Sequence, residues 1–377
     1  MRKLIDICDI QYGYAFDSAC FTEDDSYLPL VRIRDVKRGF SETFYSGEYP
    51  KEYVIHKGDL IVGMDGEFNI ARWKSIDALL NQRVCKLKAK EGTNEEYLRF
   101  ALVKALKTIE DKTAFVTVKH LSAKELNKLE LDMPGIEEQN VRAESMAKLE
   151  KVISHRKEEL SALDDLIKAR FVEMFGNPVT NEKGWTQKLL GEITIKIGSG
   201  VTPRGGKSTY QENGIALIRS MNVHNGMFEY RELAHISDEQ ATKLDNVVIE
   251  ENDVLLNITG ASVARSCVVP SEILPARVNQ HVCVIRCKEC IIPEFLNNLL
   301  IDDNYQELLW SIARAGATRE AITKQQVECL QIIMPPVELQ KEFMKFCKQV
   351  DKSKVAVQKA LDETQMLFDS LMQEYFN

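Results

Sequence analysis

Short apolar runs bounded by Gly, Asp and Asn recur along the chain, and they predict β-strands. The clearest are DLIVGM at 59–64 and DVLLNI at 253–258. They alternate with stretches of helical pattern, EEYLRFALVKAL at 95–106 and PEFLNNLLIDDN at 293–304. The pattern predicts an α+β fold in which β-rich regions also contain helices.

Two longer segments carry the apolar spacing of long helices. Each begins after a proline, in MPG at 133–135 or MPP at 334–336, and continues for about 40 residues with almost no Gly or Pro. Apolar residues recur in each at seven-residue or a/d-like spacing: Leu149, Ile153, Leu160, Leu163, Ile167 and Met174 in the first, and Phe343, Val350, Val357, Leu361, Phe368 and Leu371 in the second, with polar Thr364 in register. This predicts that the two helices pair along a coiled-coil seam, and the alternative is that each lies on its own domain.

The two halves of the chain repeat one another in the same order. The offset grows only from 187 to 201 residues, so insertions are few. The matching runs are LIDICDI-QYG and LGEITIKIGSG, LVRIRDVKRG and LIRSMNVHNG, GDLIVGMDG and NDVLLNITG, NQRVCKL and NQHVCVI, EYL and EFL, and MPGIEEQ and MPPVELQ. Six ordered matches over so long a period indicate two copies of a whole domain.

This repeat predicts the domain organisation. A first β-rich domain covers 1–133, and the first long helix covers 134–176, where Gly176 and Pro178 are suited to end it. A second β-rich domain covers 177–335 and begins with a linker, and the second long helix covers 336–377.

The net charge of −8 argues against a protein that coats nucleic acid by charge alone. Contact with DNA would need local basic patches or basic surface supplied by partners. No apolar run approaches the ~20 residues that span a bilayer, and the nine irregularly spaced cysteines suit reduced thiols. We therefore expect a cytoplasmic protein without membrane contact.

Candidate catalytic and metal motifs are absent or imperfect. Cys283, Cys287 and Cys290 have the spacing of iron–sulfur ligands, but VCVIRC resembles a strand and Cys85, which matches Cys283, has no companion cysteines, so buried structural thiols are favoured. The stretch at 200–208, GVTPRGGKS, misses the P-loop spacing by one residue and reads better as a basic loop. We expect no catalytic residue and no metal site.

Polar residues at repeated or variable positions are the candidates for DNA contact. Arg32, Arg34, Lys37 and Arg38 are clustered, and the alternative is a solvated strand end; Arg219 matches Arg32. The repeated Asn–Gln pairs suit adenine, and the alternative is a structural turn or a phosphate contact. Loops that differ between the copies, 66–74 and 260–267, both carry an arginine. The complete set of predicted DNA-binding residues is Arg32, Arg34, Lys37, Asn69, Arg72, Asn81, Gln82, Lys119, Thr202, Arg204, Lys207, Arg219, Asn222, Ser262, Arg265, Asn279, Gln280 and Arg319.

Several features together resemble the specificity subunit of Type I restriction–modification systems. They are the tandem domains with their long helices, FVEMFGNP at 171–178, the entry at Trp185 and 190–192, LIRSMNV and VNQHVCVI. The first copy departs from this pattern, since it lacks a Trp-led entry and begins almost at Leu4. The resemblance implies that each domain reads one half of a bipartite, asymmetric site on double-stranded DNA. It also implies antiparallel helices that set the spacer and dock two methyltransferase subunits.

The resemblance further implies which components come from partners. The methyltransferase subunits bring S-adenosylmethionine, and restriction translocase subunits, which use ATP and Mg²⁺, can join; this chain binds no cofactor itself. Two alternatives stay open: a specificity subunit from a system with another subunit plan, and a coiled-coil scaffold with β-rich heads that bind protein.

Overall fold

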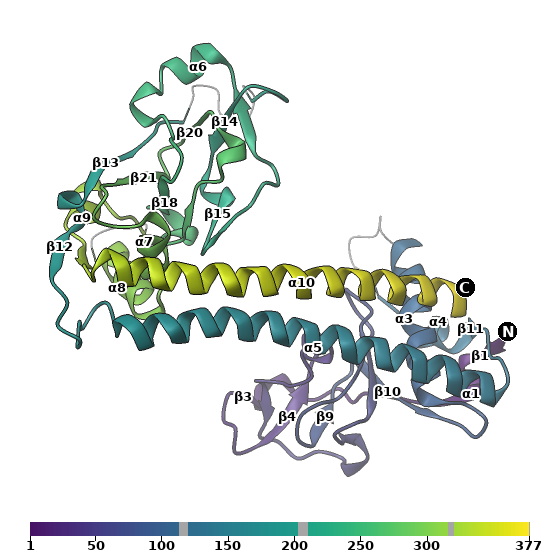
Figure 1. Cartoon of the computed structure of the whole chain (residues 1–377). Coiled ribbons are helices and arrows are strands. Elements are labelled where there is room, and N and C mark those ends of the chain that lie inside the picture. The colour runs from purple at the N-terminus through teal and green to yellow at the C-terminus, as the bar shows by residue number, and fades with distance from the viewer. Residues whose placement is uncertain (113–119, 203–209, 316–319, 377) are drawn as a thin grey trace. The chain divides into compact units, whose positions relative to one another are not determined.

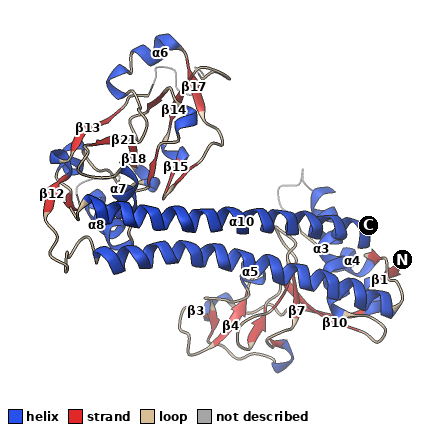
Figure 2. Ribbon diagram, viewed as in Figure 1, coloured by secondary structure: helices blue, strands red, loops and turns tan. Residues whose placement is uncertain are grey.

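The computed structural model describes residues 1–112, 120–202, 210–315 and 320–376. These form two compact units: Met1–Glu158 with Val357–Asn377, and Glu159–Ala356. Each unit is a mixed helix and sheet structure (Figures 1 and 2), which confirms the predicted α+β class with two tandem domains. Each unit contains part of both long helices, so the predicted domain boundaries stay predictions.

The elements of unit 1 follow the apolar pattern of the first copy. In chain order they are β1 (Arg2–Lys3), α1 (Leu4–Ile7), β2 (Cys8–Tyr12), η1 (Ser18–Cys20), β3 (Phe21–Thr22), β4 (Leu28–Val31), α2 (Ile33–Arg38), β5 (Phe44–Tyr45), η2 (Lys51–Tyr53), β6 (Val54–Ile55), β7 (Leu60–Gly63), β8 (Ile70–Arg72), β9 (Ala78–Leu80), β10 (Val84–Ala89), α3 (Glu95–Lys112), α4 (Ala123–Lys128), β11 (Glu130–Leu131) and the first part of α5 (Ile136–Phe175).

Unit 2 repeats this order with local differences. Its elements are β12 (Gln187–Leu189), η3 (Leu190–Glu192), β13 (Thr194–Ser199), β14 (Ile215–Ile218), η5 (Ser220–Asn222), β15 (Val223–His224), β16 (Met227–Phe228), β17 (Ala234–Ile236), α6 (Asp238–Thr242), η6 (Asp245–Val247), β18 (Val254–Asn257), η7 (Gly260–Ser262), β19 (Ser266–Val268), η8 (Ser271–Ile273), β20 (Ala276–Val278), β21 (Val282–Cys287), α7 (Pro293–Leu300), α8 (Asp303–Arg314), α9 (Lys324–Glu328), β22 (Gln331–Ile333) and the first part of α10 (Val337–Tyr375). The last part of α5 also belongs to unit 2, and the last part of α10 belongs to unit 1.

The four-stranded sheet and two strand pairs have the same topology in the two units, whereas the five-stranded sheet of unit 1 (β3-β5-β4-β9-β6) is matched in unit 2 by a three-stranded sheet (β17-β14-β20). The four-stranded sheet is ordered β2-β10-β7-β8 in unit 1 and β13-β21-β18-β19 in unit 2, and all its pairings are antiparallel. The parallel pair β4–β9 matches the parallel pair β14–β20, and the short pair β1–β11 matches β12–β22. The runs predicted as strands at 59–64 and 253–258 contain β7 and β18, which are buried at the centre of this sheet.

One helical stretch differs between the copies. In unit 1 α3 is continuous, whereas in unit 2 the chain leaves the helix at Ile301 and starts α8 at Asp303. The break is stabilised by Asp302, whose carboxylate accepts from the amides of Asn304 and Tyr305. The prediction of one helix over 293–304 was therefore wrong in detail.

Both long helices start at the predicted prolines, and a buried glutamine fixes each start. Gln139 donates to Pro134 O at 2.8 Å and accepts from the amide of Asn94 at 2.9 Å. Gln340 repeats this, donating to Pro335 O at 2.9 Å and accepting from the amide of Ile292 at 2.9 Å. The repeated Gln of MPGIEEQ and MPPVELQ thus anchors each helix to the segment before α3 or α7. Helix α5 ends at Phe175, where Gly176 has a φ of 74°, as predicted.

Within each unit the two helices contact one another in antiparallel sense. In unit 1 Arg142 donates to Tyr375 O at 2.8 Å, while Arg156 contacts Ala360 O and the hydroxyl of Thr364. In unit 2 the ammonium of Lys354 lies 2.5 Å from Asp164, and Arg170 lies 3.5 Å from Glu342. The predicted apolar stripe residues are all buried or half-buried. Regular coiled-coil packing along this contact stays a prediction.

Each long helix also contributes to a domain core. In unit 1 Phe376 packs against Tyr97 with ring centroids 5.0 Å apart, and Met146 lies in the same buried cluster. In unit 2 Phe171, Phe175, Phe295 and Phe343 form one aromatic cluster. Burying these rings provides most of the driving force that holds the helices on the domains. Among the described residues, no helix is long and apolar enough to cross a membrane.

Candidate nucleic-acid interface

A tight turn carries the repeated Asn–Gln pair in each unit. In unit 1 it joins β9 to β10, and the amide of Val84 donates to Asn81 O at 2.9 Å. In unit 2 it joins β20 to β21, and the amide of Val282 approaches Asn279 O at 3.4 Å. Two residues are therefore presented at the tip of each turn.

The asparagines stabilise the turns. Asn81 Oδ1 accepts from the amide of Gln82 at 2.8 Å, and Asn279 Oδ1 accepts from the amide of His281 at 3.0 Å. This is the structural alternative considered for the pair, and it leaves Asn279 buried. Gln82 and Gln280 are exposed, so the structure separates a supporting residue from an accessible one.

A glycine passes directly over each turn. A Cβ at Gly13 would lie 2.0 Å from Asn81 O, and one at Gly200 would lie 1.8 Å from Val278 O. Only glycine allows this approach. The matching QYG and GSG ends of the first repeat motif therefore mark where β2 and β13 contact the turn.

The backbone around the turn is the same in both units. The first residue after the central strand, Met64 or Ile258, bonds both to the turn and to the segment before the next short helix. The matching bonds are Met64 N to Arg83 O at 2.9 Å and Ile258 N to His281 O at 2.9 Å, then Leu121 N to Met64 O at 2.7 Å and Ile322 N to Ile258 O at 2.8 Å. The bridges Asp65–His120 and Thr259–Ala321 complete the correspondence.

The side chains on this shared backbone differ. In unit 1 the guanidinium of Arg83 lies 3.3 Å from Asp65, whose other oxygen contacts Nδ1 of His120. In unit 2 the hydroxyl of Thr259 lies 2.5 Å from Nδ1 of His281, and Thr202 donates to Gln280. Of these residues only Thr202 and Gln280 were predicted. Arg83, Asp65, Thr259 and His281 lie inside the repeated motifs at positions that differ between the copies, and this difference is the signal that would have found them; His120 lies outside these motifs.

The basic cluster of the first copy lies on a short helix. Arg34 and Lys37 belong to α2, and Arg32 lies between the end of β4 and this helix, so the alternative of a solvated strand end fits Arg32 alone. Asp35 is fully buried and accepts from the amide of Arg32 at 2.9 Å, which fixes the start of the helix. Arg32, Arg34 and Lys37 are exposed, and this makes them the most accessible of the predicted cations that the structure describes.

The matching segment of unit 2 is more enclosed. Asn222 takes the place of Asp35: it is buried, accepts from the amide of Arg219 at 3.0 Å and donates to Glu229 O at 2.9 Å. Arg219 is half-buried, donates to Glu232 O, and lies over the ring of Tyr210 at 5.5 Å. Both side chains support the local fold, and their burial speaks against direct DNA contact in this conformation.

Arg72 lies in strand β8 rather than in a loop. It is held by Glu95 at 2.9 Å, Glu96 at 2.5 Å and Gly58 O at 2.7 Å. Burial alone lowers the pKa of Arg72, but bonding to Glu96 and Glu95 outweighs it and raises the pKa. Arg72 is thus committed to joining β8 to α3 rather than free to meet a phosphate.

Its counterpart Arg265 is less constrained. Arg265 is half-buried and lies 3.5 Å from Nδ1 of His224. Ser262 is also half-buried, and its carbonyl accepts from the amide of Arg265 at 3.3 Å. These two residues lie together at the end of η7, at the edge of the four-stranded sheet.

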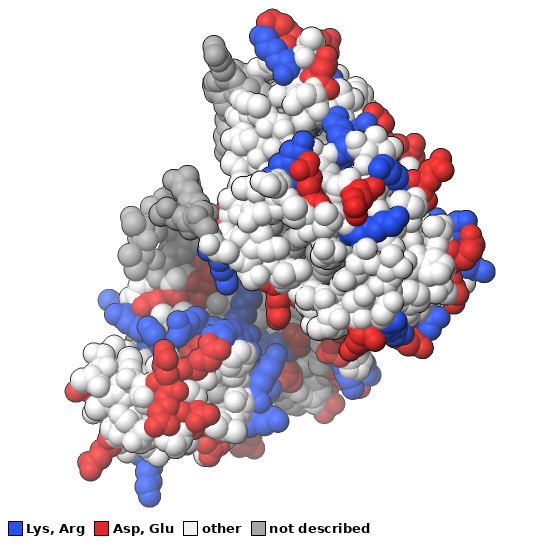
Figure 3. All heavy atoms as spheres, turned by 90° about the vertical axis from the view of Figure 1, so that its left-hand side faces the viewer, with Lys and Arg blue, Asp and Glu red and all other residues white. Residues whose placement is uncertain are grey.

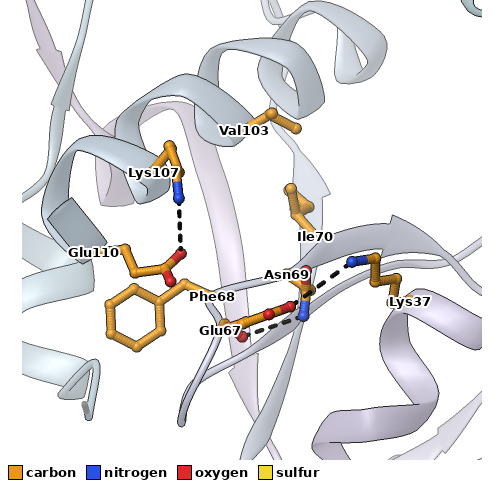
Figure 4. A pocket seen from close by; sticks show the side chains of 8 residues that line it. All are labelled: Lys37, Glu67, Phe68, Asn69, Ile70, Val103, Lys107 and Glu110. Atoms are coloured by element: carbon orange, nitrogen blue, oxygen red, sulfur yellow. Dashed lines mark hydrogen bonds and ion pairs between the residues drawn. The ribbon is translucent and has the colours of Figure 1, made fainter. Parts of the chain in front are cut away.

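Two predicted residues of the first copy share a pocket of about 390 Å³ (Figure 4). Lys37 and Asn69 line it beside Glu67, Lys107 and Glu110, with Phe68, Ile70 and Val103 as apolar walls. Lys37 lies 3.8 Å from Glu67, and Asn69 donates to Glu67 O at 3.3 Å. The mixture of both charges favours a polar surface rather than an anion site. Lys119, Arg204, Lys207 and Arg319 lie outside the described residues.

Charge is mixed on the drawn face of the molecule as well. On the face drawn in Figure 3, basic and acidic side chains are interspersed.

Burial raises the pKa of the Cys283 and Cys287 thiols to about 12, so both are protonated at neutral pH. Within the described ranges no three His, Cys, Asp or Glu side chains are grouped to hold a metal ion.

Two copies of one β-rich module, each with an exposed polar turn and a long helix, define a class of paired recognition modules. The family described as the Type I restriction modification DNA specificity domain matches this chain twice, over residues 1–163 and 182–364. The Type I restriction enzyme EcoBI specificity subunit of Escherichia coli is 29% identical over 98% of this chain and 84% of its own length. The MjaVIII specificity subunit of Methanocaldococcus jannaschii is 21% identical over 87% and 80%.

Solved structures show the same fold. The S subunit of a Type I restriction–modification system from M. genitalium superposes with a TM-score of 0.59 at 14% identity, covering 100% of this chain and 95% of that one. A chain from a structural study of type I R-M complex assembly gives 0.58 at 20% identity, covering 100% and 97%. The chain therefore belongs to the Type I restriction modification DNA specificity family, and it is a specificity subunit of such a system.

Proposed function

We propose that each β-rich domain reads one half of a bipartite, asymmetric target on double-stranded DNA. The observation that carries this is the repeated turn: the same backbone hydrogen bonds surround it in both units, while the residue after the repeated glutamine differs, Arg83 in unit 1 and His281 in unit 2. Two readers of equal geometry and unequal chemistry select two different half-sites. The mixed surface charge is compatible with this if partners enclose the duplex and supply basic surface.

The long helices have two further roles in this proposal. They hold the two readers at a set separation along the duplex, because helical phase decides which face each half-site presents. They also dock two methyltransferase subunits, one for each copy of the repeat. The antiparallel contacts within each unit support both roles, since they hold the two helices against one another.

The chain itself performs no catalysis and binds no cofactor in this proposal. The methyltransferase subunits carry S-adenosylmethionine, and restriction translocase subunits, where they join, use ATP and Mg²⁺. The complex works in the cytoplasm. Cys283 supports the non-catalytic reading, because its thiol is buried within the hydrophobic core of unit 2, as expected of a structural cysteine.

Exchanging one domain tests the proposal. Residues 177–335 are replaced by the equivalent domain of the EcoBI specificity subunit, and methylated sites are mapped in cells that also carry the methyltransferase subunits. We expect one half-site to change and the other to remain. A change in both half-sites, or methylation without sequence preference in the parent complex, would contradict it.

A further inference from the structure

We propose that the second residue at the tip of the repeated turn, Arg83 in unit 1 and His281 in unit 2, determines a base in each half-site. We call these the turn-tip residues. The inference rests on the proposed function and names the position at which each domain makes its choice.

The first step is the equivalence of the two positions. The carbonyl of each turn-tip residue accepts a hydrogen bond of 2.9 Å from the amide of the residue that follows the central strand, Met64 after β7 or Ile258 after β18. Because the backbone is held in the same way, each turn-tip side chain starts from the same place on its domain. The residue before it is glutamine in both copies, so glutamine alone cannot distinguish two half-sites.

The second step is that the neighbours change together with the turn-tip residue. Arg83 has a carboxylate beside it, Asp65, whereas His281 has the hydroxyl of Thr259 at the matching position. His120 is likewise replaced by Ala321. The supporting asparagine, in contrast, is the same in both. The asparagine that supports the turn is therefore constant. The turn-tip side chain varies, and the side chain beside it varies with it: a carboxylate beside Arg83 and a hydroxyl beside His281.

The third step is the geometry of Arg83. Its side chain is 51% exposed, and one nitrogen lies 3.3 Å from Asp65. A carboxylate only accepts, so Nδ1 of His120 donates to Asp65. The same nitrogen lies 3.3 Å from Nη1 of Arg83, so Asp65 and His120 together surround that one end of the guanidinium. A guanidinium that is held by a neighbour at one nitrogen loses less conformational entropy when it binds DNA. Its remaining N–H groups lie in one plane and are available as paired hydrogen-bond donors.

This geometry selects the ligand chemistry. The guanidinium fork matches the O6 and N7 acceptors that guanine presents in the major groove. A neutral imidazole offers one donor and one acceptor. In His281 Nδ1 is used towards Thr259, and Nε2 lies 3.2 Å from the side-chain amide nitrogen of Gln280. His281 therefore meets a base through Nε2 alone, a single contact, once the Gln280 amide has turned away. We therefore expect a guanine in the half-site of the first domain, read more strictly than the base opposite His281.

The test uses the complete methyltransferase complex with three variants: Arg83→Ala, Arg83→Lys and His281→Ala. Methylation rates are measured on a library of targets with every base at every position. For Arg83→Ala we expect the preference for guanine at one position to fall by about 10- to 100-fold. Arg83→Lys keeps the charge beside Asp65 but lacks the fork, so it should lose the same preference.

His281→Ala is the matched control, because it should relax one position of the other half-site only. Melting temperatures of the variants show whether folding is preserved. If the parent complex is selective and both Arg83 variants keep every base preference, the inference is overturned while the proposed function stands. A lysine variant that keeps the full guanine preference also overturns it. A parent complex without base preference would instead overturn the proposed function.

Discussion

Arginines at matching positions of the two copies have different roles. The guanidinium of Arg32 is exposed and, within the described part of the chain, makes no ion pair, whereas Arg219 is half-buried and bonded to Glu232 O. Sequence similarity placed the two in one class. Burial, which depends on the segment at 229–232 and on Tyr210, separates them.

This difference leads to a paired prediction. Arg32→Ala should weaken DNA binding by the assembled complex and reduce the salt slope by about one unit, without changing the melting temperature. Arg219→Ala should instead destabilise unit 2 by about 1–2 kcal/mol, because it removes a charge-assisted hydrogen bond. Salt-dependent binding and thermal unfolding measure the two effects. Equal melting temperatures with equal losses of affinity would show that both arginines are phosphate contacts.

At the scale of elements, each long helix belongs to both units. Each is fixed at its start by a buried glutamine and contributes aromatic or apolar side chains to a domain core. The contact of Arg156 with Ala360 belongs to unit 1 and that of Lys354 with Asp164 to unit 2, so both helices pass from one unit to the other between these pairs. A change of helix length is therefore best made in both helices.

We predict that helix length sets the gap between half-sites. Inserting four residues after Ser161, with four after Val357, lengthens each helix by ~6 Å and nearly completes a turn, so the apolar stripe is little disturbed. The gap should widen by one or two base pairs at ~3.4 Å each, with both half-sites unchanged.

Methylation mapping measures the gap directly. Four Gly or Ser residues inserted after Asp25, in an exposed turn, serve as the control and should leave it unchanged. An active double insertion that recognises the original gap would mean that the helices only hold partners.

At the scale of the whole molecule, buried thiols are distributed over both units. Burial raises the pKa of Cys8, Cys85, Cys267, Cys283 and Cys347 from 9.0 to about 12. In the unfolded chain these thiols lose protons near the ordinary value, so the unfolded state holds fewer protons than the folded state above that pH. Their stabilising contribution is complete below pH 9 and is lost as pH rises towards 12.

We therefore predict that the melting temperature falls steadily between about pH 9 and 12. Cys283→Ala should make this fall shallower, since one buried thiol is removed, although its melting temperature at pH 7 is lower. Cys329→Ala removes an exposed thiol and should leave the slope as it is. Identical slopes for the two variants would show that buried thiols do not govern alkaline unfolding.

Those parts of the fold that depend on a local sequence pattern could be predicted from the sequence. The central strands β7 and β18, the starts of the long helices and the end of α5 follow from apolar runs, prolines and Gly176. Comparing the copies also showed that one domain occurs twice. The site was less accessible: Arg72 was expected in a loop, yet it is a strand residue bonded to Glu95 and Glu96 on α3.

By itself, then, the sequence determined the repeat, the class of fold and the family, because these depend on periodicity and on motifs read along the chain. Only the tertiary structure decided which polar residues are free to meet DNA. Asp65, Arg83 and His120 are far apart in sequence and are brought together by hydrogen bonds from Met64 to two other segments. The physical reason is that accessibility and side-chain partners arise from packing between distant segments, which no local pattern records.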